Sequence, residues 1–123
     1  MLNRKFRLTR STDFKRVKQT GKSFAHPLVV LIRKPNPGGD LRIGLSAGRA
    51  VGNAVLRNRA KRRMRASLNS ILSKLQPGWD LVFLARKPIN TATVLDLKVA
   101  EEQLLKRAGL LLEESEMIHG SSA

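Results

Sequence analysis

Residues 57–65 read RNRAKRRMR, so six of nine positions carry Lys or Arg. Apolar residues within and around this stretch recur every three or four positions between Leu56 and Leu75. This spacing predicts an α-helix over about residues 53–75 with one face in a core. The opposite face is expected to carry Asn58, Arg59, Arg62, Arg63 and Arg65, with Arg57 and Lys61 nearer the edge of the apolar face.

The concentration of cations on one helix predicts a polyanionic ligand. Like charges three and four residues apart repel each other and destabilise the free helix. A phosphate backbone compensates for this repulsion, because neutralised phosphates release counterions and a guanidinium can donate two hydrogen bonds to phosphate oxygens. A surface that serves only solubility usually mixes both signs of charge. The stretch is therefore interpreted as a phosphate-binding helix rather than a solvated face.

The chain of 123 residues has a formal net charge of +15, which is unevenly distributed. Residues 1–75 contain 19 Lys and Arg but only 2 Asp and Glu, so the polyanion is expected to bind this part. The length suits one domain with a hydrophobic core, expected over residues 1–112. The apolar pattern fades from Leu110 onward, and residues 113–123 are expected to be a disordered tail.

Several classes of protein are disfavoured by what the sequence lacks. There is no Cys, so disulfides, thiolate zinc sites and cysteine nucleophiles are excluded. No apolar run approaches the roughly 20 residues that span a bilayer, and the N-terminus leads into no apolar signal segment. We therefore expect a cytoplasmic protein without membrane contact. Two isolated His and the two carboxylates of the basic part, Asp13 and Asp40, predict no metal site.

The rest of the chain predicts five further elements. An extended arm over residues 1–10 precedes a short helix over 12–20 and a strand over 28–32. The turn residues 35–40 lead to a second strand over 41–46, expected to pair with the first as an antiparallel hairpin. A third strand over 79–85 and a last helix capped by Thr93 and Asp96 follow the basic helix. This order predicts an α+β fold, a small αββαβα two-layer sandwich.

Residues 44–48 match the G-x-S-x-G pattern of serine hydrolases, but the chain does not support that chemistry. The hydrolase fold needs a large parallel sheet to present its serine, and this chain is too short to build one. His119, which would complete the order Ser, Asp, His, lies in the expected tail, where it could not be held within hydrogen-bond reach. No catalytic residue is assigned to this chain.

A strand ending in Gly44-Leu45-Ser46 precedes the motif R-N-R-x-K-R-x-x-R, which extends from Arg57 to Arg65. Further matching positions are Arg7-Leu8, Asp13-Phe14, Val17, Gly21 and residues 85–88. Together these residues resemble the protein subunit of bacterial ribonuclease P, from about residue 2 to residue 88. The resemblance implies an α/β sandwich with a left-handed βαβ crossover around the basic helix.

The resemblance also implies the function. A small basic protein would bind the catalytic RNA of ribonuclease P and the 5′ leader of precursor tRNA. The ribonucleoprotein would act as an endoribonuclease, hydrolysing a phosphodiester to give the mature tRNA 5′ end. The RNA would coordinate magnesium and perform the cleavage, so the protein would need no cofactor of its own and no obligatory protein partner.

Site residues follow from the same resemblance. RNA is expected to contact Arg49, Asn53, Arg57, Asn58, Arg59, Lys61, Arg62 and Arg65. The leader is expected in a cleft formed by Phe14, Val17, Lys18 and Ile32. Phe14 matches an aromatic position of the family, whereas Lys18 and Ile32 stand where relatives often carry Phe or Tyr. Because base stacking on aromatic residues contributes about 1–3 kcal/mol per base, leader binding here is expected to depend more on charge and shape.

A structural RNA-binding protein of the ribosomal type is the alternative. Such a protein would share the charge and the small α+β fold. It would have no reason to combine the R-N-R helix with the spacing of Phe14, Val17 and Gly21. A sequence-specific DNA binder fits less well, because the helix carries few short polar side chains that could contact base edges.

Overall fold

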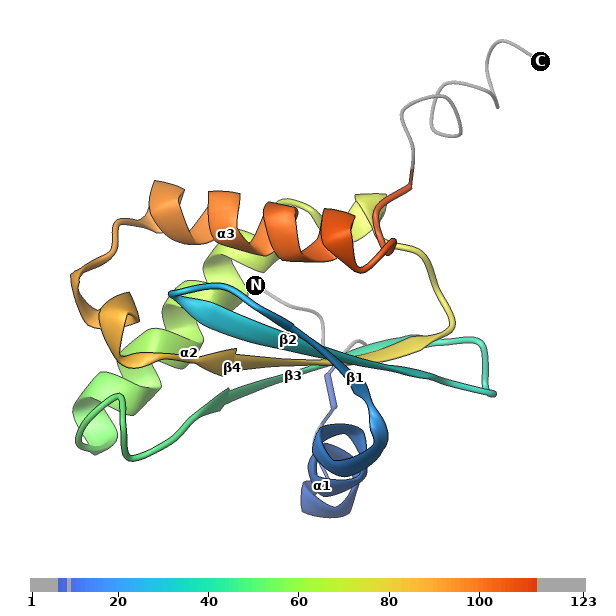
Figure 1. Ribbon diagram of the computed structural model, residues 1–123, viewed down its shortest axis with the longest axis horizontal. Helices are drawn as coiled ribbons and strands as arrows, with labels where there is room; N and C mark the ends of the chain where they lie inside the picture. The colour runs from blue at the N-terminus through green and yellow to red at the C-terminus, as the bar shows by residue number, and fades with distance from the viewer. Residues whose placement is uncertain (1–6, 9, 113–123) are drawn as a thin grey trace, which may run out of the picture.

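A computed structural model describes residues 7, 8 and 10–112 (Figure 1). The elements are, in chain order, α1 (Ser11–Thr20), β1 (Lys22–Ala25), β2 (Val29–Pro35), β3 (Leu41–Ala47), α2 (Ala54–Asn69), η2 (Leu72–Lys74), β4 (Trp79–Ala85), η3 (Lys87–Thr91) and α3 (Val94–Arg107). The helices and the mixed sheet confirm the predicted α+β class. The predicted tail and most of the predicted N-terminal arm lie outside the described residues.

The four strands of the described sheet lie in the order β1-β2-β4-β3. β2 pairs antiparallel with both β1 and β4, whereas β3 pairs parallel with β4. The predicted hairpin of residues 28–32 with 41–46 is therefore wrong, because β4 lies between these two strands. A central position buries both faces of a strand, and β4 has the residues for it, since Leu81, Val82 and Phe83 are all fully buried.

The strand β1 has no counterpart among the predicted elements. Its four residues read KSFA, and three of them are exposed. Such a short and mostly exposed strand is typical of a sheet edge. The turn residues 35–40 do mark a reversal of the chain, but they do not determine which strand pairs with which.

The helix α2 connects β3 to β4, its parallel neighbour, so it forms the βαβ crossover for which the resemblance predicts a left-handed path. α2 ends at Asn69, earlier than the predicted end near residue 75. The chain continues through the short η2, and Ile71 and Leu75 are still buried there. The apolar spacing therefore continues beyond the end of the helix, which explains why the sequence predicted a longer helix.

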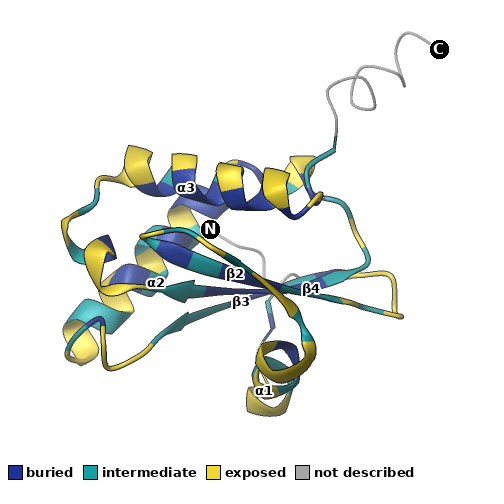
Figure 2. Ribbon diagram, viewed as in Figure 1, coloured by how far each residue is buried: buried dark blue, intermediate teal, exposed yellow. Residues whose placement is uncertain are grey.

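Helices cover both faces of the sheet, so the described chain has three layers where the sequence predicted two (Figures 1 and 2). The larger core lies between the sheet and the pair α2 and α3, where Ile43 and Phe83 pack with Met64 and Leu104. α1 lies on the opposite face, where a smaller cluster contains Leu8, Val17, Ile32 and Val82. The side of α3 that faces the sheet is buried and its outer side is exposed (Figure 2).

The last helix is capped as predicted and leads into a further core residue. The Thr93 side chain accepts a hydrogen bond from the Asp96 N–H, and the Asp96 carboxylate accepts one from the Thr93 N–H. After α3, Leu110 is fully buried although the apolar pattern has faded. Leu111 pairs with Leu75, so the core extends to the end of the described residues. None of the described helices has the length and apolar content to cross a bilayer.

Candidate nucleic-acid interface

The basic face of α2 is set by how the helix starts and what it buries. Asn53 is the N-cap, and its side-chain oxygen accepts a hydrogen bond from the Leu56 N–H at 3.0 Å. Ala60, Met64 and Leu68 are buried against the sheet and α3. This orientation turns the opposite side of α2 to solvent. Asn53, which was predicted to contact RNA, is thus already engaged in starting the helix.

Most of the predicted RNA-binding residues lie on this solvent side. Asn58, Arg59 and Arg62 are exposed, and Arg49 is exposed in the turn before the helix. Arg57, Lys61 and Arg65 are half-buried. Ion pairs among the described residues involve only the carboxylates of Asp13 and Asp80, so none neutralises a cation of α2.

Arg63 does not belong to the solvent face on which it was predicted. It is half-buried, and its guanidinium donates hydrogen bonds to the carbonyl oxygens of Ile89, at 2.7 Å, and Ala92. The reason is that α2 contacts η3 and α3 as well as the sheet, so its buried arc is wider than the apolar period indicates. Arg63 therefore holds the connection between η3 and α3.

Arg65 offers an unused donor. Its Nε atom is buried and has no hydrogen-bond partner among the described residues. A buried N–H group without an acceptor costs about 1–3 kcal/mol. Arg65 lines two hollows of the surface, one with Asn58 and Arg62 and one with Phe14. A ligand bound in either hollow would therefore lie beside the Arg65 side chain.

An open groove of about 630 Å³ lies between α1 and the end of β3. Its lining residues are Ser11, Thr12, Phe14, Lys15 and Lys18 of α1, Leu45, Ser46 and Ala47 of β3, and Lys61 of α2. None of them is acidic. The Lys18 ammonium donates to the Ser46 hydroxyl at 3.4 Å, which places it across the groove. The groove thus combines one aromatic ring with three ammonium groups.

Two of the four residues predicted to form the leader cleft lie in this groove and two do not. The structure places Phe14 and Lys18 in its lining. Val17 is 0% exposed and Ile32 is 4% exposed, because both pack in the core between α1 and the sheet. They offer no surface to a ligand, which corrects their predicted place in its lining.

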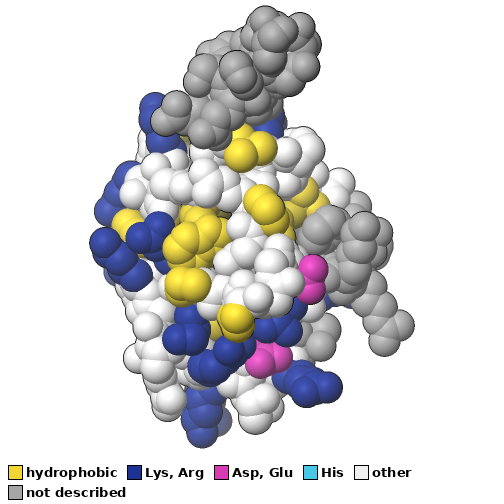
Figure 3. Space-filling view, turned by 90° about the vertical axis from the view of Figure 1, so that its right-hand side faces the viewer, with side chains coloured by type: hydrophobic (Ala, Val, Ile, Leu, Met, Phe, Trp, Pro, Cys, Tyr) yellow, Lys and Arg dark blue, Asp and Glu magenta, His cyan; other side chains and the backbone are white. Residues whose placement is uncertain are grey.

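The groove and the basic face of α2 are continuous. Lys61 lines the groove and also both hollows that Arg65 lines. Basic side chains extend beyond this region as well. On the face that lies at the right of Figure 1, Lys and Arg side chains cover much more of the described surface than Asp and Glu side chains do (Figure 3).

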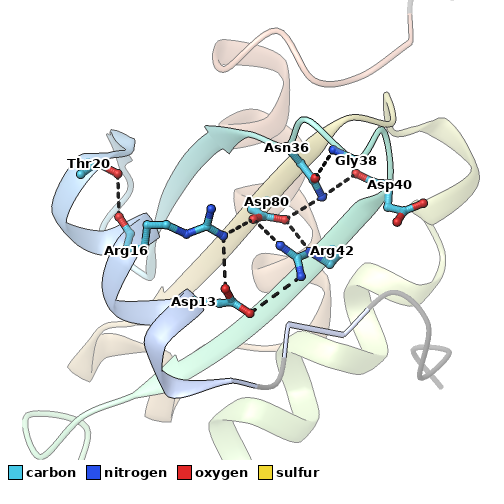
Figure 4. A network of polar contacts seen from close by, with 8 residues as sticks. All are labelled: Asp13, Arg16, Thr20, Asn36, Gly38, Asp40, Arg42 and Asp80. Atoms are coloured by element: carbon cyan, nitrogen blue, oxygen red, sulfur yellow. Dashed lines mark hydrogen bonds and ion pairs between the residues drawn. The ribbon is translucent and has the colours of Figure 1, made fainter.

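A polar cluster holds α1 on the sheet beside the groove (Figure 4). The buried carboxylate of Asp80 accepts hydrogen bonds from Arg16 at 3.0 Å, from Arg42 twice at 2.9 Å, and from Asn36 at 3.1 Å. Asp13 in α1 pairs with both arginines, at 3.3 and 3.8 Å. The hydrogen bond to Asp80 raises the pKa of Arg42 above its ordinary value.

Sequence reasoning missed this cluster and part of the groove. Asp80 offered one signal, since it is a lone carboxylate in an otherwise apolar strand. Lys15 follows Phe14 directly, and Leu45-Ser46 forms part of the motif, but neither was assigned to a site. Residues 7, 8 and 10–112 contain no group of three or more His, Cys, Asp or Glu side chains placed to hold a metal ion.

Comparison with known proteins places this chain in a family. The sequence model of the family described as Ribonuclease P matches residues 2–109. A ribonuclease P protein component of Herpetosiphon aurantiacus is 35% identical over 109 residues, covering 89% of each chain. One from Chloroflexus aurantiacus is 39% identical over 111 residues, covering 89% of this chain and 82% of that protein. The solved RNase P protein of Staphylococcus aureus superposes with a TM-score of 0.77 at 31% identity, covering 86% of this chain and 97% of that one.

Proposed function

This chain belongs to the ribonuclease P protein family, and on that premise we propose that the α2 face binds the catalytic RNA while the groove binds the 5′ leader of precursor tRNA. As a member of this family, the chain is part of an endoribonuclease ribonucleoprotein that acts in tRNA processing. One observation carries the proposal further. The groove and the α2 face meet at Lys61, and no carboxylate of the described residues lines either of them.

The α2 face suits a folded RNA. Its cations form no ion pairs with the described carboxylates, so binding phosphates breaks no existing ion pair. Each phosphate neutralised by Lys or Arg releases condensed counterions. Arg65 adds its positive charge to the hollow that it lines with Asn58 and Arg62. These cations also reduce repulsion between the catalytic RNA and the precursor, which magnesium would otherwise have to screen.

The groove suits a single strand of any sequence. Phe14 offers one ring on which a base could stack, and Lys15, Lys18 and Lys61 surround it with positive charge. Stacking and charge tolerate all bases, because every base has a π-face and every nucleotide carries a phosphate. Such a site fits a leader whose sequence differs from one precursor tRNA to the next.

The chemical step is assigned to the RNA partner. Magnesium ions on the RNA would supply the metal chemistry, and the residues of this chain would bind and orient the substrate. The place of action is proposed to be the cytoplasm. The ribosomal type of structural RNA-binding protein remains the alternative against which the experiment is designed.

The experiment measures cleavage of a precursor tRNA at low magnesium by the protein alone, by a bacterial ribonuclease P RNA alone, and by both. Cleavage is expected only in the mixture. Tight RNA binding without stimulation would contradict the proposal and favour the structural alternative. Cleavage by the purified protein alone would contradict the assignment of chemistry to RNA.

A further inference from the structure

Asp80 is the most heavily bonded carboxylate of the described chain. It lies at the start of the central strand β4, and its side chain is 0% exposed. Within β4 it shares a face with Val82, which packs beneath α1. Its two oxygens accept four hydrogen bonds from Arg16, Arg42 and Asn36 (Figure 4). A buried carboxylate requires such partners, because ionised groups are costly to remove from water.

The cluster is electrically balanced within a very basic protein. Asp13 and Asp80 face Arg16 and Arg42, so two negative charges meet two positive ones. Neither arginine lines the groove or the hollows of the α2 face. These two cations are therefore committed to holding the fold together rather than to binding a polyanion.

The helix α1 needs this attachment. It has only 10 residues, and isolated helices of that length are marginal in water. Its N-cap residue, Arg10, makes no side-chain capping bond, and Val17 is the one residue of α1 that is buried. Beside the apolar contacts of Phe14 and Val17, the pairs formed by Asp13 and Arg16 fix its position on the sheet.

The same helix forms one wall of the groove. It contributes Phe14, Lys15 and Lys18, whereas the facing wall belongs to β3 and Lys61. We propose that Asp80 is a positioning residue, which acts through Arg16 to hold α1 at the distance from β3 that the groove requires. The inference rests on the proposed role of the groove in binding the leader.

The position of α2 should not depend on this cluster. α2 packs on the opposite face of the sheet, in the larger core. Releasing α1 should therefore change how the leader is bound and leave the binding of catalytic RNA unchanged. This separation distinguishes a positioning role from a general contribution to stability.

The test uses Arg16, because its side chain is 40% exposed and its replacement leaves the Asp80–Arg42 pair in place. Arg16→Met keeps the apolar stem and removes the bond to Asp80. Arg16→Lys keeps a charged donor for Asp80 and should restore function. Lys106→Met, on the exposed side of α3, is the control for the loss of one charge. Asp80→Asn is a second variant, which weakens the bond between Arg16 and Asp80 by removing the charge of the acceptor.

The readout is kcat/KM of the reconstituted holoenzyme for a precursor tRNA with a long single-stranded leader, divided by that for a precursor with a one-nucleotide leader. Arg16→Met should lower this ratio by roughly 5–10-fold, the lower end of the effect of removing one base-stacking interaction. Arg16→Lys should recover most of it, and the affinity for the catalytic RNA and its salt dependence should not change.

Three results would overturn the inference. Arg16→Met could leave the ratio unchanged, it could slow both substrates equally, or Lys106→Met could lower the ratio as much. A different result would refute the proposed function itself. If the wild-type protein shows no preference for the long leader, the groove does not bind it, and the positioning role fails with that assignment.

Discussion

At the scale of single residues, neighbouring arginines of α2 have different surroundings. Arg59 and Arg62 are exposed, whereas Arg63 donates to the Ile89 and Ala92 carbonyls. Consecutive helical residues are separated by only about 100°, so Arg62 and Arg63 cannot be assigned to different sides from periodicity alone. Phosphate binding should therefore depend on Arg59 and Arg62, and stability on Arg63.

Replacing Arg59 and Arg62 with Ala should weaken binding to ribonuclease P RNA and reduce its salt dependence. The slope of log K against log salt should fall by roughly 0.7–0.9 for each phosphate that the variant no longer neutralises. The measurement is equilibrium binding over a series of salt concentrations, with Lys106→Ala as the control. An unchanged slope in the double variant would show that α2 is not the phosphate-binding face.

Arg63→Ala should lower the stability of the protein without changing its binding to RNA. The Ala92 carbonyl would lose its Arg63 donor and the Ile89 carbonyl would keep only the Ala92 N–H, so the free energy of unfolding should fall by about 1–3 kcal/mol. The salt dependence of RNA binding should stay at the wild-type value. Urea denaturation and the same binding series measure the two effects. A reduced slope with unchanged stability would place Arg63 on the RNA face after all.

Glu101 makes the stability depend on pH. It lies buried between α3 and α2, where one of its oxygens contacts the Ser67 hydroxyl and the other has no partner among the described residues. Burial raises the pKa of Glu101 to about 8 from the ordinary 4.5, against the opposing effect of the Ser67 hydrogen bond. Between these values the folded protein keeps the proton and the unfolded chain releases it. Stability is therefore expected to fall as pH rises from about 4.5 to about 8.

Glu101→Gln should flatten this pH dependence, because an amide does not titrate. One proton contributes at most about 1.4 kcal/mol per pH unit to the wild-type slope. Urea denaturation at several pH values measures the slope, and Asp40→Asn, which removes an exposed carboxylate that does not act on Glu101, is the control. Equal slopes in the wild type and Glu101→Gln would show that Glu101 is ionised in the folded protein.

At the scale of elements, two glycines determine how closely α1 approaches the sheet. A Cβ added at Gly21 would lie 2.6 Å from the Val17 carbonyl oxygen and 2.7 Å from that of Arg33. A Cβ at Gly44 would lie 2.5 Å from the ring of Phe14. Backbone atoms at Gly21 have nowhere to move, whereas the Phe14 ring can turn toward the groove that it lines.

Substitutions at Gly21 and Gly44 should therefore have different effects on stability and on leader binding. Gly21→Ala should lower the free energy of unfolding by about 1–3 kcal/mol or more, as overpacking does. Gly44→Ala should cost less stability but displace Phe14, and so reduce the preference of the holoenzyme for a long leader. Gly48→Ala is the control, because an added Cβ there meets no atom within 4 Å. An undiminished leader preference in Gly44→Ala would remove Phe14 from the leader site.

At the scale of the whole molecule, the parts that the sequence predicted well are those with a local cause. The capping residues Thr93 and Asp96, the apolar strand β4 and the basic face of α2 all follow from nearby residues. The position of β4 between β2 and β3 depends on contacts far apart in sequence, and so does the pairing of Asp80 with Arg16. Val17 and Ile32 were predicted to line a cleft, but only the packing of α1 on the sheet shows that both are buried.

The groove also depends on elements that are far apart in the sequence, because α1, β3 and α2 each supply part of its lining. Its continuity with the α2 face through Lys61 is the basis of the central claim, that one surface holds the catalytic RNA and the leader side by side. A test of this claim must identify which RNA lies at each part of that surface.

Site-directed crosslinking gives the most direct measurement. The chain has no Cys, so a single Cys substitution carries the only thiol to which a photoreactive group can be attached. The positions are Lys18→Cys in the groove, Arg59→Cys on α2, and Lys106→Cys on α3 as the control. In the holoenzyme with precursor tRNA, position 18 should crosslink to the leader, position 59 to the catalytic RNA, and position 106 to neither. Crosslinking of position 18 to the catalytic RNA alone, or equal yields from position 106, would contradict the account.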